Sequence, residues 1–372
     1  MPYLDRARRE SALIVGFVAV PFFSFIGGNW LSNSPNSALL VAAFVATTVL
    51  VLLCAFRALH HAGTLAVRFG EPYGSLLLTL SILSIEVSLI AAVMLTGSPD
   101  PTLARDTMFA GFMLTMNGVV GVVVLSGGLR HRQQEFNLEG ARAYLAALIP
   151  LAVTALVLPN FTRSQTGALS DTQAIAIGIA TVLFYGIFLG VQTMRHREFF
   201  TDPHESASAH HTPEPAAAGP TASNLAVHFI VLLLALIIIA FLGRELAKVV
   251  DYGIHRLNIP VALGGILIAI LTLTPESVSA FRAALEDKLQ HSVNVFLGGA
   301  LSSIGLTVPC VLILGVLADR RVVLGLQGTD MVLLLLTLFV SSLTFGGVRT
   351  NMLQGVVHLL LFFLYLVFII NP

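Results

Sequence analysis

Two glutamates inside long apolar runs are the residues of this chain whose chemistry stands out. Glu276 directly follows Pro275 in one run, and Glu86 lies within another. Each glutamate is 12 residues after a glycine, Gly264 and Gly74 respectively. A carboxylate at the centre of a bilayer costs several kcal/mol unless it lines a cavity or meets a cation. We therefore interpret the two glutamates as equivalent positions of an internal repeat and as candidate functional residues.

Oxygen-bearing side chains accompany both glutamates at helical spacing. Thr272 and Ser279 share the helix face of Glu276, and Thr79 shares that of Glu86. The proline before Glu276 leaves a backbone carbonyl one turn earlier without its usual donor. Such a carbonyl is tolerated at membrane depth where it lines a cavity or binds an ion, and hard cations prefer oxygen ligands. The alternative is that each glutamate is protonated and hydrogen-bonded to a neighbouring helix. It is less favoured because the two glutamates lie at matching positions of the repeat.

The apolar run after each glutamate carries further polar residues. Asn117 lies in the first of these runs, and Ser302 and Ser303 lie in the second. Small residues and hydroxyls also serve as ordinary packing material between membrane helices. Packing and ion coordination therefore fit the two serines equally well, whereas the asparagine favours coordination.

The composition is that of a polytopic membrane protein. The chain has 372 residues, of which 56% are hydrophobic and 11% charged, and its mean hydropathy is +0.88. Soluble domains carry about 25% charged residues. The formal net charge of zero gives no indication of nucleic-acid binding. Cys54 and Cys310 both fall in apolar runs, which predicts two buried thiols rather than a disulfide.

A helix needs about 20 apolar residues to cross a bilayer. On this criterion the sequence predicts an all-α protein with about eleven membrane helices. The runs do not alternate in polarity as the strands of a membrane barrel would. The predicted spans are near residues 11–29, 38–56, 74–97, 107–127, 143–160, 172–193, 225–242, 259–281, 293–317, 330–346 and 354–370.

The order of these spans predicts four parts. We expect an N-terminal helix (1–36), a first five-helix repeat (37–194), a linker (195–223) and a second five-helix repeat (224–372). Because five is odd, the second repeat enters the membrane from the opposite side. This inverted topology is typical of secondary transporters, whose sites lie near the bilayer midplane.

The linker is rich in His, Pro and Ala, and it contains His204, His210 and His211. A metal- or pH-sensing loop is one interpretation. A solvated cytoplasmic linker is favoured, because the histidine spacing matches no firm metal motif.

Most of the 20 Lys and Arg residues fall in connections on the N-terminal side of the membrane. This bias predicts a cytoplasmic N-terminus and an external C-terminus. The basic segment 243–258, which this arrangement treats as an external connection, fits the bias poorly.

Several ordered motifs resemble one known family. GGALSSIGLTVP (298–309), QEFNLEGAR (134–142) and RTNMLQG (349–355) resemble segments of the calcium/cation antiporter superfamily, cation/proton exchanger branch. EVSLI (86–90) and TPE (274–276) look most like the bacterial sodium-potassium/proton and calcium/proton antiporters. The resemblance extends from about Arg57 to the end of the chain.

The resemblance implies eleven helices in inverted repeats, and glutamates at 86 and 276 that bind cation and proton in competition. Asn117, Ser302 and Ser303 are their implied neighbours. The chain departs from the family where many exchangers have Gly-Asn before each glutamate, since Ile82-Leu83 and Thr272-Leu273 stand there. A glutamine common in the second repeat is Ser303 here. Fewer side-chain oxygens favour sodium, potassium or broad selectivity over a tight calcium site.

We therefore predict a secondary antiporter of a bacterial-type inner membrane. It would exchange cytoplasmic Ca²⁺, Na⁺ or K⁺ for external protons by alternating access, with the lipid bilayer as its surroundings and no resident cofactor. One alternative is a cation channel without obligatory proton coupling. The other, an intramembrane enzyme, is disfavoured because the sequence has no His-Glu-x-x-His motif.

Overall fold

The computed structural model describes residues 10–33, 37–70, 73–96, 101–162, 167–202, 222–257, 260 and 262–371. Eight of its helices are long and apolar enough to cross a membrane, and three shorter apolar helices accompany them in the described part of the chain. These helices confirm the expected all-α, polytopic architecture. The linker residues His204, His210 and His211 lie outside the described residues.

The helices follow the predicted apolar runs, and π-helical segments (η1, η5) interrupt two of them. The helices that precede the linker are α2 (Ser11–Asn33), α3 (Ser37–Phe69), α4 (Tyr73–Thr96), α5 (Leu103–Met113), η1 (Leu114–Val119), α6 (Val120–His131), α7 (Leu138–Leu156), η2 (Leu158–Phe161), α8 (Asp171–Gly190), η3 (Val191–Arg195) and η4 (Arg197–Phe200). Those that follow it are α10 (Ala222–Leu257), α11 (Ala262–Leu285), α12 (Leu289–Ser302), η5 (Ser303–Thr307), α13 (Val308–Leu317), α14 (Gly328–Thr344) and α15 (Met352–Ile370).

Polar side chains mark where several of these helices begin. The first turn of a helix has backbone amides without an intrahelical acceptor, and a side-chain oxygen at the N-cap can supply one. Asn137 accepts hydrogen bonds from the amides of Glu139 and Gly140 at the start of α7. Ser170 and Asn351 form capping boxes at the starts of α8 and α15.

Two helices continue past the charges that were expected to end them. α3 extends through Arg57 to Phe69, and the Arg57 guanidinium is paired with the Glu10 carboxylate. α10 extends to Leu257, so the prediction of a connection at 243–258 is wrong. There Glu245 is only 4% exposed, and the Lys248 ammonium lies 2.8 Å from its carboxylate. Pairing within or between helices therefore allows charged residues to remain helical at the ends of these spans.

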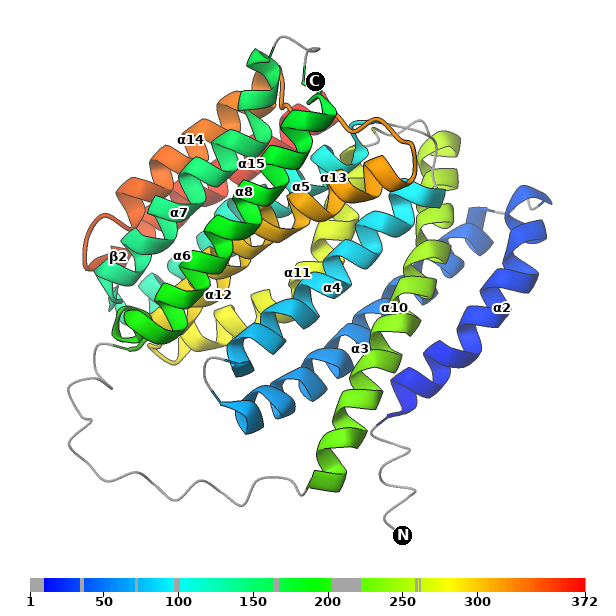
Figure 1. The fold of residues 1–372 in the computed structure, drawn as a ribbon, viewed down its shortest axis with the longest axis horizontal. Coiled ribbons are helices and arrows are strands. Elements are labelled where there is room, and N and C mark those ends of the chain that lie inside the picture. Colours follow the sequence, from blue (N-terminus) through cyan, green and yellow to red (C-terminus); the bar gives the residue numbers. More distant parts are fainter. Residues whose placement is uncertain are drawn as a thin grey trace. The chain divides into compact units, whose positions relative to one another are not determined.

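The chain forms two compact units. Unit 1 comprises Met1–Asp100 and Ala216–Pro275, and it contains α2, α3, α4, α10 and the first half of α11. These helices pack side by side (Figure 1), and their core includes Val51, Leu89 and Ile239. A Cβ added at Gly243 of α10 would lie 2.4 Å from Leu89 of α4, so this glycine permits the close approach of the two helices.

Unit 2 comprises Pro101–Pro215 and Glu276–Pro372. In it α6 packs against α15, α7 against α12, and α8 against α13. A short antiparallel ribbon joins β1 (Gln133–Glu135) to β2 (Arg349–Asn351), with Gln134 opposite Thr350. The ribbon therefore connects segments from the middle and the end of the chain.

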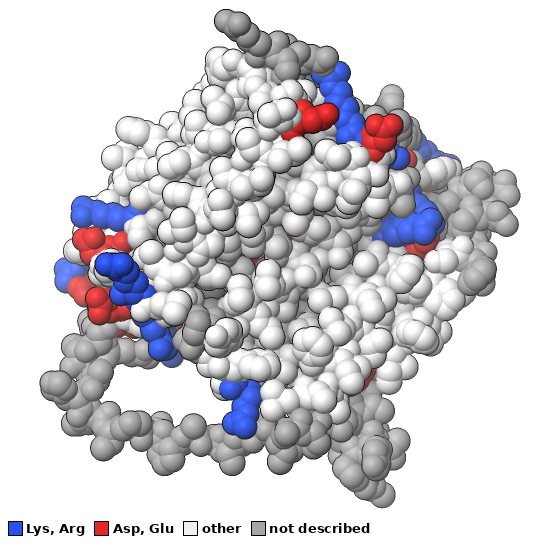
Figure 2. All heavy atoms as spheres, in the orientation of Figure 1, with Lys and Arg blue, Asp and Glu red and all other residues white. Residues whose placement is uncertain are grey.

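Each unit takes helices from both halves of the chain. Unit 1 holds the two helices α3 and α4 from before the linker together with α10 from after it. Cys54 and Cys310 are free thiols, as expected, but only Cys54 is fully buried, whereas Cys310 is half-buried. Figure 2 shows broad areas of surface without any charged side chain, as expected for a protein that contacts lipid.

Candidate cation and proton site

Glu276 of α11 lies against a glycine of α12. Its side chain is half-buried, and a Cβ added at Gly299 would lie only 3.2 Å from its Oε2 atom. The carboxylate therefore occupies space that any residue larger than glycine would restrict. Gly298 beside it faces Tyr144 instead, since a Cβ added there would lie 3.3 Å from the Tyr144 hydroxyl oxygen.

Ser302 and Ser303 lie one turn beyond this contact. Ser302 is 9% exposed, and its hydroxyl donates a hydrogen bond to the Gly299 carbonyl at 3.0 Å. A hydroxyl that donates its proton to its own helix keeps its oxygen lone pairs for a cation. Ser303 is the first residue of the π-helical segment η5, and such segments occur often at functional sites.

Asn117 lies in another π-helical segment, η1, where it is fully buried. Its amide nitrogen donates to the Thr337 hydroxyl at 2.8 Å, and its amide oxygen lies 3.1 Å from Nδ1 of His358. The other ring nitrogen of His358 lies 3.0 Å from the Thr344 hydroxyl. Asn117 is thus held by a buried network from α14 and α15.

The sequence provided little sign of this network. No motif in the sequence marks His358 or Thr337 as part of a site. The only available signal was a histidine within the strongly apolar last span. A histidine in apolar surroundings needs hydrogen-bond partners, because a buried polar group without them is costly.

Glu86 and Thr79 both lie on α4 in unit 1, and both are half-buried. Glu86 is about one turn before Leu89, which packs against Gly243 of α10. Thr272 also belongs to unit 1, and its hydroxyl donates to the carbonyls of Ile268 and Ala269. This threonine therefore keeps its lone pairs available in the same way as Ser302.

Ser279 lies one turn after Glu276 and is exposed. Its hydroxyl is 3.2 Å from Nε2 of His291, which lies in the first turn of α12. Unit 2 thus holds Glu276, Ser279, Asn117, Ser302 and Ser303, and unit 1 holds Glu86, Thr79 and Thr272. Two of the π-helical segments meet α12, since η1 packs against it and η5 continues it.

No group of three or more His, Cys, Asp or Glu side chains suited to hold a metal ion occurs among the described residues. Around Gly299, α11 and α12 offer the Glu276 carboxylate, the Ser302 hydroxyl and the backbone carbonyl of Gly299. Such a set suits hard cations such as Ca²⁺, Na⁺ or K⁺ better than thiophilic metals.

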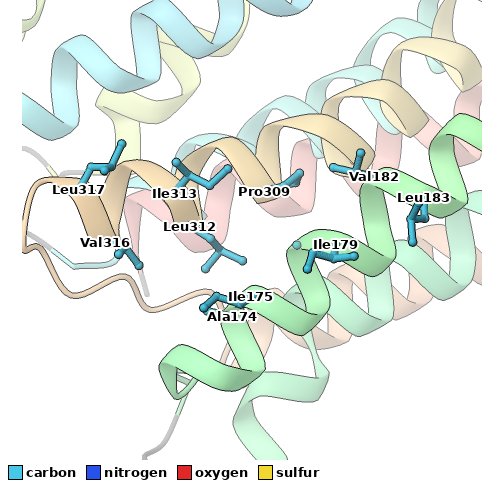
Figure 3. A pocket seen from close by; sticks show the side chains of 11 residues that line it. Ala174, Ile175, Ile179, Val182, Leu183, Pro309, Leu312, Ile313, Val316 and Leu317 are labelled. Carbon is cyan, nitrogen blue, oxygen red and sulfur yellow. The ribbon is translucent and has the colours of Figure 1, made fainter.

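An apolar groove of about 420 Å³ lies between α8 and α13 in unit 2 (Figure 3). Its lining includes Ile175, Ile179 and Val182 of α8, and Pro309 and Ile313 of α13. The lining residues carry no side-chain oxygen or nitrogen, so this groove has no side chain with which to coordinate an ion.

Comparison of the chain with known proteins identifies its relatives. The family model described as sodium/calcium exchanger protein matches residues 39–194 and 227–371. The "Putative ionic transporter y4hA" of Sinorhizobium fredii (strain NBRC 101917 / NGR234) is 42% identical over 317 residues, which are 84% of each chain. The sodium-potassium/proton antiporter ChaA of Escherichia coli (strain K12) is 35% identical over 358 residues, covering 96% of this chain and 95% of that one.

A solved structure has the same fold. The crystal structure of the selenium-substituted Ca²⁺/H⁺ antiporter protein YfkE superposes with a TM-score of 0.72 at 18% identity. The match covers 97% of this chain and 99% of that one. The matched family model, these relatives and the shared fold together show that the chain is a member of the calcium/cation antiporter superfamily, in its cation/proton exchanger branch.

Proposed function

We propose that this protein is a secondary antiporter that exchanges cytoplasmic cations for external protons across a bacterial-type inner membrane. Glu86 and Glu276 each bind a proton or share in binding a cation, but not both at once. The main observation behind the proposal is that the Glu276 carboxylate lies against Gly299, within helices long and apolar enough to cross a membrane. Membership of the exchanger family supports the same activity.

Competition for one carboxylate is sufficient for exchange. The ionised glutamate binds a cation together with hydroxyl and carbonyl oxygens, and protonation removes the charge that holds the cation. Alternating access then carries cations one way and protons the other, provided that the unloaded ionised form does not switch sides. That form is costly to enclose, because an ionised carboxylate without a bound cation loses solvation in a low dielectric.

We propose Thr272 and Ser302 as the side-chain oxygens that accompany the carboxylates. Both hydroxyls donate their protons to their own helices. Thr79, Ser279 and Ser303 complete the proposed set, and Asn117 supports η1 from its buried network. Because few amide oxygens are available, we propose Na⁺ or K⁺, with or without Ca²⁺, as the transported cations. The N-terminus is proposed to be cytoplasmic and the C-terminus external.

The test is dissipation of a proton gradient in everted membrane vesicles, with Na⁺, K⁺ and Ca²⁺ added separately. Wild type is compared with Glu276→Gln and Glu86→Gln. Each change removes the charge but keeps the shape, so cation-dependent proton release is expected to fall about tenfold or more, as loss of one charged interaction predicts.

Glu286→Gln is the matched control. Glu286 is exposed, and its partner is Lys288 in the turn after α11. This control is expected to keep wild-type exchange. Full exchange in Glu276→Gln would make that glutamate a structural acid, and cation flux without proton movement would indicate a channel instead.

A further inference from the structure

Four ionisable side chains meet in unit 1, and none of them belongs to the candidate cation site. Glu10 directly precedes α2, Arg57 and His61 extend from α3, and His228 extends from α10. Nε of Arg57 donates to Oε2 of Glu10 at 3.2 Å, and Nε2 of His61 lies 3.3 Å from the same oxygen. Nδ1 of His61 lies 2.7 Å from Nδ1 of His228. We call these four residues the His61 network.

The distance between the two Nδ1 atoms requires a proton between them. Nε2 of His61 faces the Glu10 carboxylate at 3.3 Å and Nη2 of Arg57 at 3.5 Å, and we assign the proton to Nε2 because its shorter contact is to an acceptor. Neutral His61 must then accept at Nδ1, and His228 donates. When His61 becomes an imidazolium, both of its nitrogens donate and His228 accepts instead. The hydrogen bond survives this first protonation with its direction reversed.

A second proton cannot be accommodated in the same geometry. It would place a hydrogen on both Nδ1 atoms at a separation of 2.7 Å, and two imidazolium rings would repel each other. The pair therefore has room for one added proton, and its two ionisations must be strongly coupled.

A counter-charge for protonated His61 is present in the network. The His61 side chain is nearly buried and faces the Glu10 carboxylate. Burial raises the pKa of Glu10, but hydrogen bonds from Arg57 and His61 outweigh this effect, so the pKa lies below its usual value of 4.5. Glu10 is thus ionised at neutral pH and supplies the negative charge that an imidazolium needs.

The packed helices bring few other charges to the His61 network. On α3, Arg57 belongs to the network, Arg68 lies two turns beyond His61, and the exposed His60 ring lies 5.5 Å from that of His61. The described residues of α2 are uncharged, and α4 carries only Tyr73 and Glu86 as ionisable groups. On α10 the next charged residue after His228 is Arg244, more than four turns away.

We propose that the His61–His228 pair is a proton-binding site additional to Glu86 and Glu276. It takes up one proton from the solution at the N-terminal end of α2. A hydrogen bond with an ionised donor is stronger than a neutral one. The added proton therefore strengthens the His61–His228 hydrogen bond and stabilises the packing of α10 against α3. The pH dependence of exchange then contains a histidine ionisation that is separate from the glutamates.

The first test follows the histidines directly and does not require transport. The full chain, labelled with ¹⁵N at histidine, is titrated in lipid bilayers from about pH 8 to about pH 5, the range in which histidine ionises. Wild-type Nδ1 signals of His61 and His228 are expected to move together. In His228→Gln the midpoint of His61 is expected to shift by about half a pH unit or more, the effect of losing one hydrogen bond.

His60→Gln is the matched control, because His60 is the exposed neighbour on the same helix. It is expected to remove one signal and leave the others unmoved. Glu10→Gln is a second variant, which should lower the midpoint of His61 by removing its counter-charge. Independent titration of His61 and His228, or an unchanged His61 midpoint in both network variants, would overturn the proposal.

The second test measures the pH profile of cation/proton exchange and rests on the proposed function. His228→Gln is expected to match wild type near pH 8.5 and to differ about threefold or more at the acidic end of the range in which histidine ionises. Identical profiles at every pH would refute a role in transport. Absence of exchange in wild type would refute the proposed antiport instead, and the histidine titration would still decide on the proton site.

Discussion

At the scale of single residues, this protein places a carboxylate where glycine leaves room for it. A glutamate within a bilayer requires compensation, and hydroxyls that have already donated their protons keep lone pairs that can bind a cation beside the carboxylate. Gly299 sets the distance between Glu276 and the backbone of α12. The position of the carboxylate is therefore controlled by a residue that has no side chain of its own.

Replacing this glycine should move the carboxylate without removing it. In Gly299→Ala the new methyl group would lie 3.2 Å from Oε2 of Glu276, tighter than an ordinary contact. The apparent KM for the cation is expected to rise about threefold to tenfold, since a small misplacement of a ligand weakens binding. The measurement is cation-dependent proton release at several cation concentrations.

Gly186→Ala is the control for this change. Gly186 is also helical, in α8, but nothing lies within 4 Å of a Cβ added there. Its exchange should equal that of wild type. An unchanged KM in Gly299→Ala would show that Glu276 tolerates the displacement and that its position is not restricted by α12.

At the scale of elements, two motifs far apart in the sequence meet in one ribbon. The segments 134–142 and 349–355 contribute to β1 and β2, which pair in antiparallel register. Gln134 is 2% exposed, and its amide donates to the Ala284 carbonyl at 2.8 Å and to the Asp287 carboxylate at 2.9 Å. The hydrogen bonds of one buried glutamine thus connect the ribbon to the end of α11 and the turn that follows it.

Gln134 should matter more to stability than the charged pair beside it. Gln134→Ala removes the donor for a buried carbonyl and is expected to lower the free energy of unfolding by about 1–3 kcal/mol. Glu135→Gln breaks the exposed pair with Arg349 and should cost less than about 1 kcal/mol. Thermal unfolding in detergent micelles measures both, and equal losses would contradict this ranking.

At the scale of the whole molecule, each compact unit contains segments from both halves of the chain. Unit 1 combines Met1–Asp100 with Ala216–Pro275, and the division within α11 falls at Pro275. Proline removes one intrahelical hydrogen bond, so this is a point where a helix is intrinsically less continuous. The N-terminal helix α2 is joined to the rest of unit 1 by packing and by the Glu10–Arg57 pair.

That pair makes the stability of the protein depend on pH. Because the pKa of Glu10 is lower in the folded chain than its usual 4.5, the stabilisation is fully present above this value. It is lost as the pH falls through the lower, folded-state pKa. The difference in melting temperature between wild type and Glu10→Gln should shrink as the pH falls below 4.5 and should vanish below the folded-state pKa of Glu10.

A matched control is Glu139→Gln, whose partner Arg142 is exposed on α7. Its melting temperature should stay close to that of wild type across this range, because exposed pairs contribute little. A difference for Glu10→Gln that keeps growing as the pH falls below 4.5 would contradict a lowered pKa of Glu10 in the folded chain.

The sequence alone predicted the helical architecture and the candidate glutamates. Apolar runs of sufficient length report membrane helices directly, since lipid requires backbone hydrogen bonds to close within each helix. An ionisable residue inside such a run is conspicuous for the same reason. The motifs of Glu86, Glu276 and the 298–309 segment also predicted the family, which the comparisons confirm.

Only the tertiary structure decided which residues meet. The extension of α3 and α10 past their charges depends on partners such as Glu10, which is 47 residues from Arg57, and on pairs whose geometry needs a formed helix. The hydrogen bonds of Asn117 to Thr337 and His358 span more than 200 positions. Local periodicity contains no information about such distant pairs, because they form only when packing brings separate helices together.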